Sequence, residues 1–241
     1  MGLARRDSLI STLDSNRKLC LTRQSELRHI LEQPHPPADA LGGFLEQHAR
    51  LHSAQAGLGA IWSYEDEIFN GLSEAQARHI PPKGEHSIAW MVWHIARIED
   101  IAMNLLVAGS EQVFSQAGWL ERMKVSWRDS GNAMSGDEIA ALSAAIDLAA
   151  LRAYRAAVGR RTRQIVQELQ PSDLPRKVDS ERIQRVRDEG AVLEAASGII
   201  DYWSKRTIAG LLLMPASRHI LVHLNEALDL RKGEAFASPK S

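Results

Sequence analysis

Apolar residues recur every three or four positions along most of this 241-residue chain, the spacing that gathers them on one face of an α-helix. No stretch alternates apolar and polar residues over the length of a strand, and no internal repeat is visible. The pattern therefore predicts an all-α fold, with long helical segments over residues 39–72, 88–107, 135–169 and 215–231.

The segments around these helices differ from them in composition. Residues 3–33 are periodic and charged and stop at the proline-rich stretch 34–37, which predicts an N-terminal helical extension and a stiff linker. Residues 110–134 mix glycines and serines with aromatic residues, which predicts an irregular insertion that could cover a pocket. We expect three regions: an extension and linker over 1–38, a bundle over 39–231 and a disordered tail over 232–241.

The first long segment carries polar residues on its apolar face. Its face includes Trp62 and is interrupted by His48, Gln55 and Glu65. These side chains either find hydrogen-bond partners locally, as buried polar groups usually do, or line a polar pocket. His52 lies off this face, so on one continuous helix His48 and His52 would not both point at the core.

The second segment is the most apolar, and Ser87 is placed to cap its start. His94 falls in the middle of its apolar arc, and Glu99 lies on a second, partly apolar flank. A strip of three polar residues is expected to face solvent: Arg97, Asp100 and Asn104. A lone histidine in such an arc is either a hydrogen-bonded core residue or a ligand, and a partner on another helix would decide between them.

The last segment supplies that partner. Pro215 is expected in its first turn, and His219 and His223, four residues apart, share one narrow stripe with Glu226 and Leu230. Nine histidines would give roughly 0.3 such pairs by chance and the chain has two, so the spacing alone does not decide. Three neutral imidazoles from two helices would form a metal site with open positions, as catalytic zinc sites do.

Composition sets limits on the environment and the partners. The 29 basic and 30 acidic residues leave a net charge of −1, which provides no field to attract nucleic acid or an anionic membrane. The single cysteine, Cys20, can form no internal disulfide, and no apolar run is long enough to span a membrane. We expect a cytoplasmic protein that binds neither nucleic acid nor membrane.

Five arginines crowd the second half of the third segment: Arg152, Arg155, Arg160, Arg161 and Arg163. They form either a solvated helix face, which we expect, or a patch that binds an anion such as the carboxylate of a thiol cofactor.

The run SIAWMVWHIARIED over residues 87–100 and the later His219-x-x-x-His223 together resemble the DinB-like superfamily. The resemblance spans residues 39–231 and implies an up-down-down-up four-helix bundle, here with the N-terminal helical extension and an insertion between helices 2 and 3. It implies that His94, His219 and His223 bind a divalent metal, zinc or nickel. His48, Glu65, Glu99 and Trp62 are then expected to support the ligands or line the pocket.

The resemblance implies several possible activities. Relatives include transferases and isomerases that use low-molecular-weight thiols, so the resemblance implies a thiol-dependent S-transferase or isomerase that acts on a small molecule, and we expect a homodimer. Where the family often continues its last histidine with Arg-Gly-Gln, this chain has Leu-Asn-Glu, so Glu226 could add a ligand, orient a histidine or act as a catalytic base. A metal-dependent hydrolase and a non-catalytic, stress-related metal-binding bundle are the alternatives.

Overall fold

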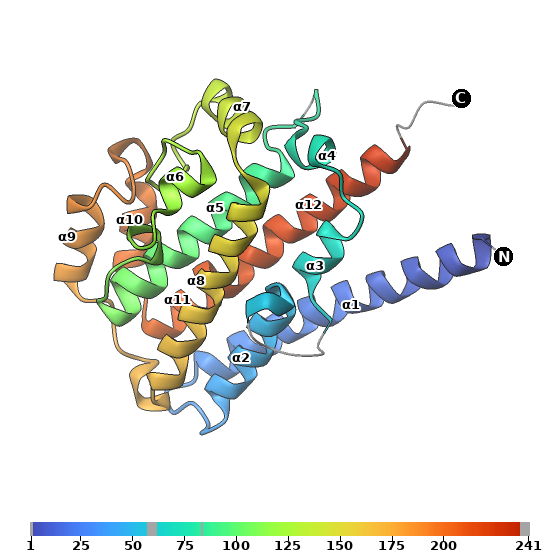
Figure 1. The fold of residues 1–241 in the computed structure, drawn as a ribbon. Coiled ribbons are helices and arrows are strands. Elements are labelled where there is room, and N and C mark those ends of the chain that lie inside the picture. The colour runs from blue at the N-terminus through green and yellow to red at the C-terminus, as the bar shows by residue number, and fades with distance from the viewer. Residues whose placement is uncertain (1, 57–61, 83, 237–241) are drawn as a thin grey trace.

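The computed structural model describes residues 2–56, 62–82 and 84–236, with side chains described over 13–56, 62–82 and 84–233. The described residues fold into helices and turns without a β-strand, so the predicted all-α class is confirmed (Figure 1). The α-helices are α1 (Gly2–Leu31), α2 (Ala40–Leu51), α3 (Tyr64–Phe69), α4 (Glu74–Arg78), α5 (Ile88–Asp100), α6 (Trp119–Met123), α7 (Gly136–Ala145), α8 (Leu148–Glu168), α9 (Ser180–Asp188), α10 (Gly198–Ser204), α11 (Ile208–Leu213) and α12 (His219–Phe236).

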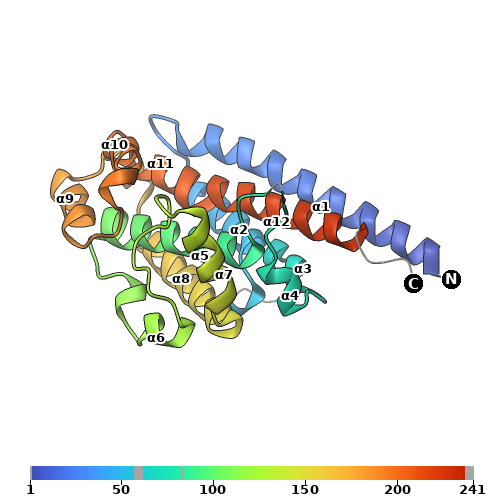
Figure 2. The ribbon, with the colours of Figure 1, turned by 90° about the horizontal axis from the view of Figure 1, so that it is seen from above.

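Helix α5 lies at the centre of the arrangement. It packs against α8 on one side and α12 on another, while α12 also packs against α3. Helix α1 runs beside α12 and α11 along one face of the molecule (Figure 2). The helices therefore pack side by side as in a helical bundle. The up-down-down-up order of four helices stays a prediction.

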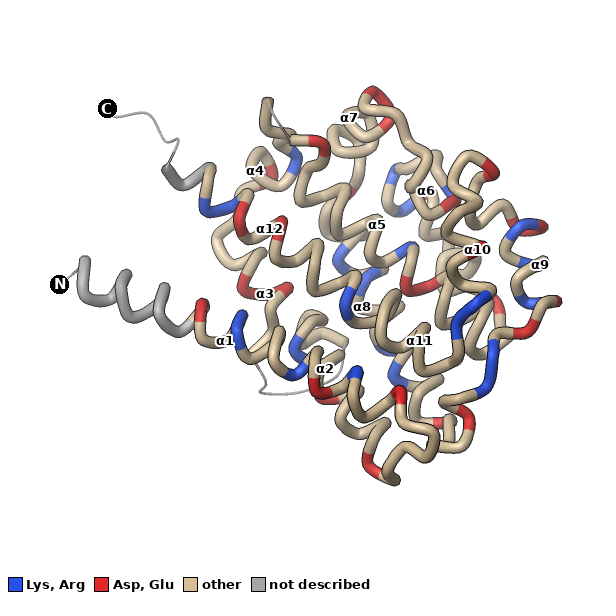
Figure 3. The backbone as a smooth tube through the Cα atoms, turned by 180° about the vertical axis from the view of Figure 1, so that it is seen from behind, with Lys and Arg blue, Asp and Glu red and all other residues tan. Residues whose placement is uncertain are grey.

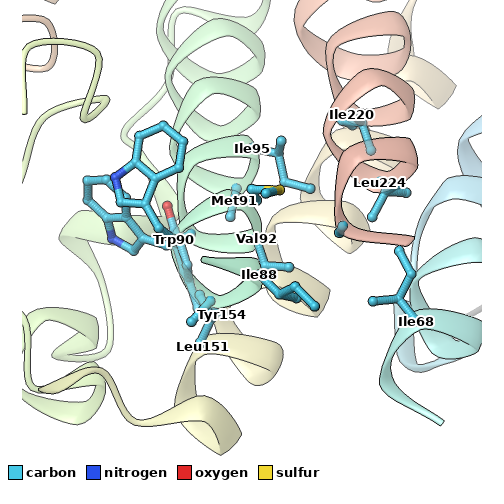
Figure 4. Packing of buried hydrophobic residues seen from close by; sticks show 14 of the residues in the cluster. Ile68, Ile88, Trp90, Met91, Val92, Ile95, Leu151, Tyr154, Ile220 and Leu224 are labelled. Atoms are coloured by element: carbon cyan, nitrogen blue, oxygen red, sulfur yellow. The ribbon is translucent and has the colours of Figure 1, made fainter. Parts of the chain in front are cut away.

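The core between these helices is apolar. Ile95 of α5 and Ile220 and Leu224 of α12 are almost fully buried and lie between the two helices (Figure 4). Burying one such side chain stabilises the fold by about 1.5–3 kcal/mol. The buried residues between α5 and α12 therefore hold these two helices together.

Helix α5 begins where the sequence predicts. The Ser87 hydroxyl accepts a hydrogen bond from the backbone N–H of Trp90 and thereby caps the helix. The helical path continues through a π-helical segment, Ile101–Ala108, and ends at Gly109, whose φ of 69° favours glycine.

Two of the predicted long helices are broken, and in both cases a short polar side chain starts a new helix. The segment over 39–72 ends as α2 at Leu51, because His52 is extended, and restarts as α3, whose cap is Ser63. Residues 57–61, which include Leu58 of the predicted apolar face, lie outside the described residues. The segment over 135–169 breaks between α7 and α8, where the Asp147 carboxylate accepts from the N–H of Ala150.

The helix that carries the histidine pair starts earlier than predicted. Pro215 lies inside a π-helical segment, Met214–Arg218, that joins α11 to α12 without a break. A proline lacks the N–H that an α-helix needs, and the wider π turn accommodates that loss. The Ser217 hydroxyl lies within hydrogen-bonding distance of the carbonyls of Leu212 and Leu213, at 2.9 and 3.0 Å, and so satisfies acceptors at this irregularity.

The N-terminal segment forms one long helix that packs onto the bundle. The Gln24 amide of α1 donates to the carbonyl of Leu213 and to Ser217, so α1 supports the π-helical segment directly. Helix α12 runs to Phe236, past the start of the predicted tail, and residues 237–241 lie outside the described residues. The region boundaries at 38 and 231 stay predictions.

The polar strip of α5 was expected to face solvent, and this is wrong. Arg97, Asp100 and Asn104 are buried, at no more than 1% exposure, because the insertion covers them. The Asp100 carboxylate accepts hydrogen bonds from the backbone N–H groups of Val113 and Phe114. It also forms an ion pair with Arg97. The strip is thus an anchor for the insertion, which the local pattern could not reveal.

Replacing the Asp100 carboxylate tests this anchor. In Asp100→Ala the buried Arg97 guanidinium loses its ion-pair partner and two backbone N–H groups lose their acceptor, so the free energy of unfolding should fall by about 3–5 kcal/mol. Urea denaturation measures this. The matched control, Glu111→Ala at an exposed position of the same insertion, should change stability by less than about 0.5 kcal/mol. Equal effects of the two changes would show that the strip is no anchor.

Candidate metal site

His94 lies in the middle of α5 with its ring buried. Its Nδ1 lies 2.6 Å from the carbonyl oxygen of Ser130, which belongs to the insertion. A carbonyl can only accept, so Nδ1 carries the proton and donates it, and Nε2 keeps a free lone pair. Burial lowers the pKa of His94 to about 3, with the neighbouring His223 adding to the effect, so the ring stays neutral as a metal ligand must.

His219 and His223 occupy the first turn and a half of α12 and face His94. Ring centroids are 5.0 Å apart for His94 and His219, 5.2 Å for His94 and His223, and 4.7 Å for His219 and His223. The three rings stand edge to face, at 70–88° to one another, and one ligand atom from each lies within 4.8 Å of the others. The structure thus brings together the three histidines that the sequence singles out.

The donor set fits a divalent ion. The His219 Nδ1 is a buried polar atom without a hydrogen-bond partner among the described residues, an arrangement that is costly unless something binds there. Burial lowers the pKa of His219 well below its usual range, so this ring is also neutral. Zinc and nickel both accept neutral imidazole nitrogens.

Glu226 is placed to orient a ligand. Its Oε2 lies 2.7 Å from Nδ1 of His223, so His223 donates there and, like His94, leaves Nε2 free. Such carboxylate partners fix the tautomer and the direction of a metal-binding histidine. Glu226 is half exposed and lies outside the group whose ligand atoms converge. Of the three roles open from the sequence, the geometry favours orientation of His223.

The three histidines line a cavity of about 740 Å³. Apolar and aromatic side chains from several segments shape it: Ile80, Trp90, Met134 and Ile139. Met134 comes from the chain stretch predicted to cover a pocket, and here it does line one. The volume is in the range of sites for small molecules.

His86 is a cavity residue that the sequence reasoning missed. Its ring stacks on Trp90 at 3.9 Å between centroids, and Trp90 stacks in turn on His94 at 4.6 Å. Trp90 and His94, four residues apart, share one face of α5, but His86 lies in the loop before the Ser87 cap, so helical spacing gives no signal for it.

A second group of ligand-type residues lies deeper in the bundle. His48, His52 and Glu99 are fully buried, and one ligand atom from each lies within 4.8 Å of the others. His48 Nε2 lies 2.8 Å from Glu99 Oε1 and His52 Nε2 lies 2.9 Å from Oε2, the latter with poorer alignment. Arg155 donates to the same Glu99 oxygen at 2.6 Å and to Glu65 at 3.2 Å.

Two expectations for these residues are wrong. His48 and His52 both point into the core, with rings stacked at 4.0 Å between centroids, because the extended backbone at His52 redirects its side chain. Arg155 is fully buried rather than part of a solvated face, because Glu65 and Glu99 pair with it from two other helices.

The remaining predicted residues divide between the groups. Glu65 and Glu99 belong to the deeper group, and Trp62 packs near Tyr64, with ring centroids 5.4 Å apart, beside a separate surface hollow. None of these three lines the cavity of the histidine triad in the described part of the chain. The backbone carbonyl of Gln55 accepts a hydrogen bond from the Arg160 guanidinium, and Gln55 itself is exposed.

Tautomers distinguish the two groups. If His48 and His52 held an ion through Nε2, their protons would lie on Nδ1, where neither has an acceptor among the described residues. With the protons on Nε2, both rings face the Glu99 carboxylate. Burial would raise the pKa of Glu99, but His52, Arg155 and the His48 hydrogen bond lower it well below its usual range. Arg155 and the two histidine rings therefore already surround the Glu99 carboxylate, whereas Nε2 of His94 and of His223 keeps a free lone pair.

Comparison with known proteins supports a family. A family model described as the DinB superfamily matches residues 58–214, which is more than half of the chain. The match includes His94 and ends before His219 and His223. No curated protein matches the chain significantly. In the described residues no helix is long and apolar enough to cross a membrane.

Acid titration tests the deeper group. Burial lowers the pKa of His52 to about 3, and the nearby Arg155 adds to this effect. Between about pH 6.5 and 3, His52 is therefore protonated in the unfolded chain but neutral in the folded chain. The free energy of unfolding should therefore decrease as the pH is lowered from about 6.5 to about 3. His52→Gln should reduce this slope by about 1.4 kcal/mol per pH unit, measured by denaturation at several pH values. The exposed His29→Gln is the control; an unchanged slope in His52→Gln would show that His52 is protonated in the fold.

Proposed function

The chain belongs to the DinB superfamily, and we propose that it binds a divalent metal through His94, His219 and His223 and is a thiol-dependent S-transferase or isomerase. Members of this superfamily typically bind metal. The single observation that carries the proposal is the convergence of three imidazoles on one cavity, with the Nδ1 atoms of His94 and His223 already paired with acceptors.

Each protein group has a separate task in this proposal. The Ser130 carbonyl and the Glu226 carboxylate hold the tautomers of His94 and His223, so that Nε2 of each faces the cavity. Three uncharged ligands leave the full double charge of the ion in place, and an ion of that charge lowers the pKa of a thiol bound to it. The stacked rings of His86 and Trp90 and the side chain of Met134 shape the space for a small substrate.

The protein's own thiol is not suited to the reaction. Cys20 is buried on α1, and burial raises its pKa to about 11, so it is almost wholly protonated near neutral pH. A nucleophilic sulfur must therefore come from a cofactor or substrate.

A hydrolase is the second candidate, because the half-exposed carboxylate of Glu226 lines a hollow that adjoins the cavity and shares His86 and His223 with it. In that case Glu226 would remove a proton from water as a general base. Its contact with His223 favours orientation instead, since the oxygen nearest the site already accepts from Nδ1.

Single alanine changes test the ligand set. His94→Ala, His219→Ala and His223→Ala should each lower bound metal by at least tenfold, measured by elemental analysis of protein purified without an affinity tag, because each removes one of three ligands. His48→Ala is the matched control from the deeper group and should keep its metal. Loss from His48→Ala with retention in the other three would assign the metal to the deeper group.

Two changes at Glu226 separate the candidate reactions. Glu226→Gln keeps an oxygen that can accept from His223, so metal binding and turnover with low-molecular-weight thiols and electrophiles should largely survive. Glu226→Ala removes that acceptor, and metal affinity should fall about 10–100-fold. Kinetics at saturating metal distinguish the outcomes. A loss of hydrolysis of about 100-fold or more in Glu226→Gln, with metal retained, would instead identify a base. Absence of any thiol binding would contradict the thiol proposal.

A further inference from the structure

A second concave site lies on the opposite side of α12 from the histidines. It is a groove of about 520 Å³ lined by residues of α1, α10, α11 and α12, and Figure 3 shows the backbone of these helices from behind the view of Figure 1. At about 100° per residue, Leu221 and Asn225 of α12 point to the groove, well away from His219 and His223, and Arg218 lines it from the end of the π-helical segment. The groove and the histidine cavity are thus both lined by α12, but they have no lining residue in common.

The groove collects exposed apolar surface. Among described residues five large apolar side chains are exposed, and three of them line this groove: Leu21, Tyr202 and Val222. Leu213 and Leu221 add buried apolar surface beside them. Apolar side chains gathered in one hollow, rather than scattered singly, indicate a binding surface.

The charge of the groove differs from that of the whole chain. Three arginines, Arg28, Arg206 and Arg218, line it against one carboxylate, Glu32, which Arg28 already pairs with at 3.2 Å. Arg206 and Arg218 have no ion pair with a carboxylate in the described residues. Two uncompensated guanidiniums beside an apolar floor suit a molecule with one anionic end and one apolar end.

Two buried polar atoms of the lining lack partners among the described residues. The Arg206 Nε is a donor without an acceptor, held in place because its guanidinium lies 3.9 Å over the Tyr202 ring and its stem passes closely over Gly210. The Gln24 Oε1 is an acceptor without a donor, and its orientation is fixed because Nε2 donates to Leu213 and Ser217. A ligand that carries both an acceptor and a donor at its polar end would satisfy both atoms.

We propose that this groove binds a monomeric amphipathic carboxylate with a hydroxyl or amide N–H donor next to its acid group, the chemical class of hydroxy-fatty acids and N-acyl amino acids. The carboxylate pairs with Arg206 and Arg218, the donor faces Gln24, and the chain lies on Leu21, Leu221 and Val222. The site depends on α1, which lies outside the residues matched by the family model, and it does not rest on the proposed function.

Calorimetric titration of the full chain with 3-hydroxydecanoate, below the concentration at which it forms micelles, tests the proposal. Saturable binding of one molecule is expected, several-fold tighter than decanoate and at least tenfold tighter than decanol or decylamine, because charged hydrogen bonds depend on the acid. Shorter chains should bind about fourfold more weakly for each methylene removed.

Variants locate the site. Arg206→Gln, Arg218→Gln and Val222→Asp should each weaken binding at least tenfold, while Arg187→Gln, an exposed arginine on α9, should leave it unchanged. Circular dichroism confirms folding, and since Arg218 and Val222 are exposed, those two variants keep the test valid if Arg206→Gln unfolds. Absence of binding, equal binding of decanol, insensitivity to all three variants, or binding only to phosphatidylglycerol vesicles would each overturn the proposal.

Discussion

The packing of α5 against α12 is the contact on which the rest of the molecule depends. Apolar residues such as Ile95 and Ile220 are fully buried where the two helices meet. This close packing brings the His94 ring to within 5.0–5.2 Å of the rings of His219 and His223, measured between centroids. The π-helical turn before His219 and the support it receives from Gln24 of α1 set the rotation of α12, so the N-terminal helix takes part in aligning the site.

Polar burial supports this contact from two sides. On one side the insertion reaches back to α5 through Asp100 and supplies the carbonyl of Ser130 that fixes His94. On the other, the group around Glu99 joins α2, α5 and α8 through Arg155 and His48. Unpaired, each of these charges would cost several kcal/mol, so each group stabilises one arrangement of the helices over its alternatives. His94 and Glu99 lie five residues apart on α5 and point in different directions, so one helix carries both the histidine cavity and the buried ionic group.

Local patterns predicted the class of fold, the start of α5 and the inward direction of all three histidines, because caps and helical spacing depend on neighbouring residues. The breaks at His52 and Asp147 escaped prediction, since the apolar period continues across both of them. Arg155 is buried because it pairs with Glu99, which lies more than 50 residues away along the chain. Arg97 is buried because the insertion folds over it. A helix wheel contains neither kind of information, and so it assigned both arginines to solvent.

If His94, His219 and His223 hold the metal, one ion binds at the three histidines and none at the deeper group. Anomalous diffraction at the absorption edge of the bound metal, from crystals of untagged protein, tests this most directly. We expect one peak about 2.0–2.2 Å from Nε2 of His94 and of His223 and from a nitrogen of His219. A peak among His48, His52 and Glu99, or a metal-loaded crystal without a peak at the triad, would contradict it.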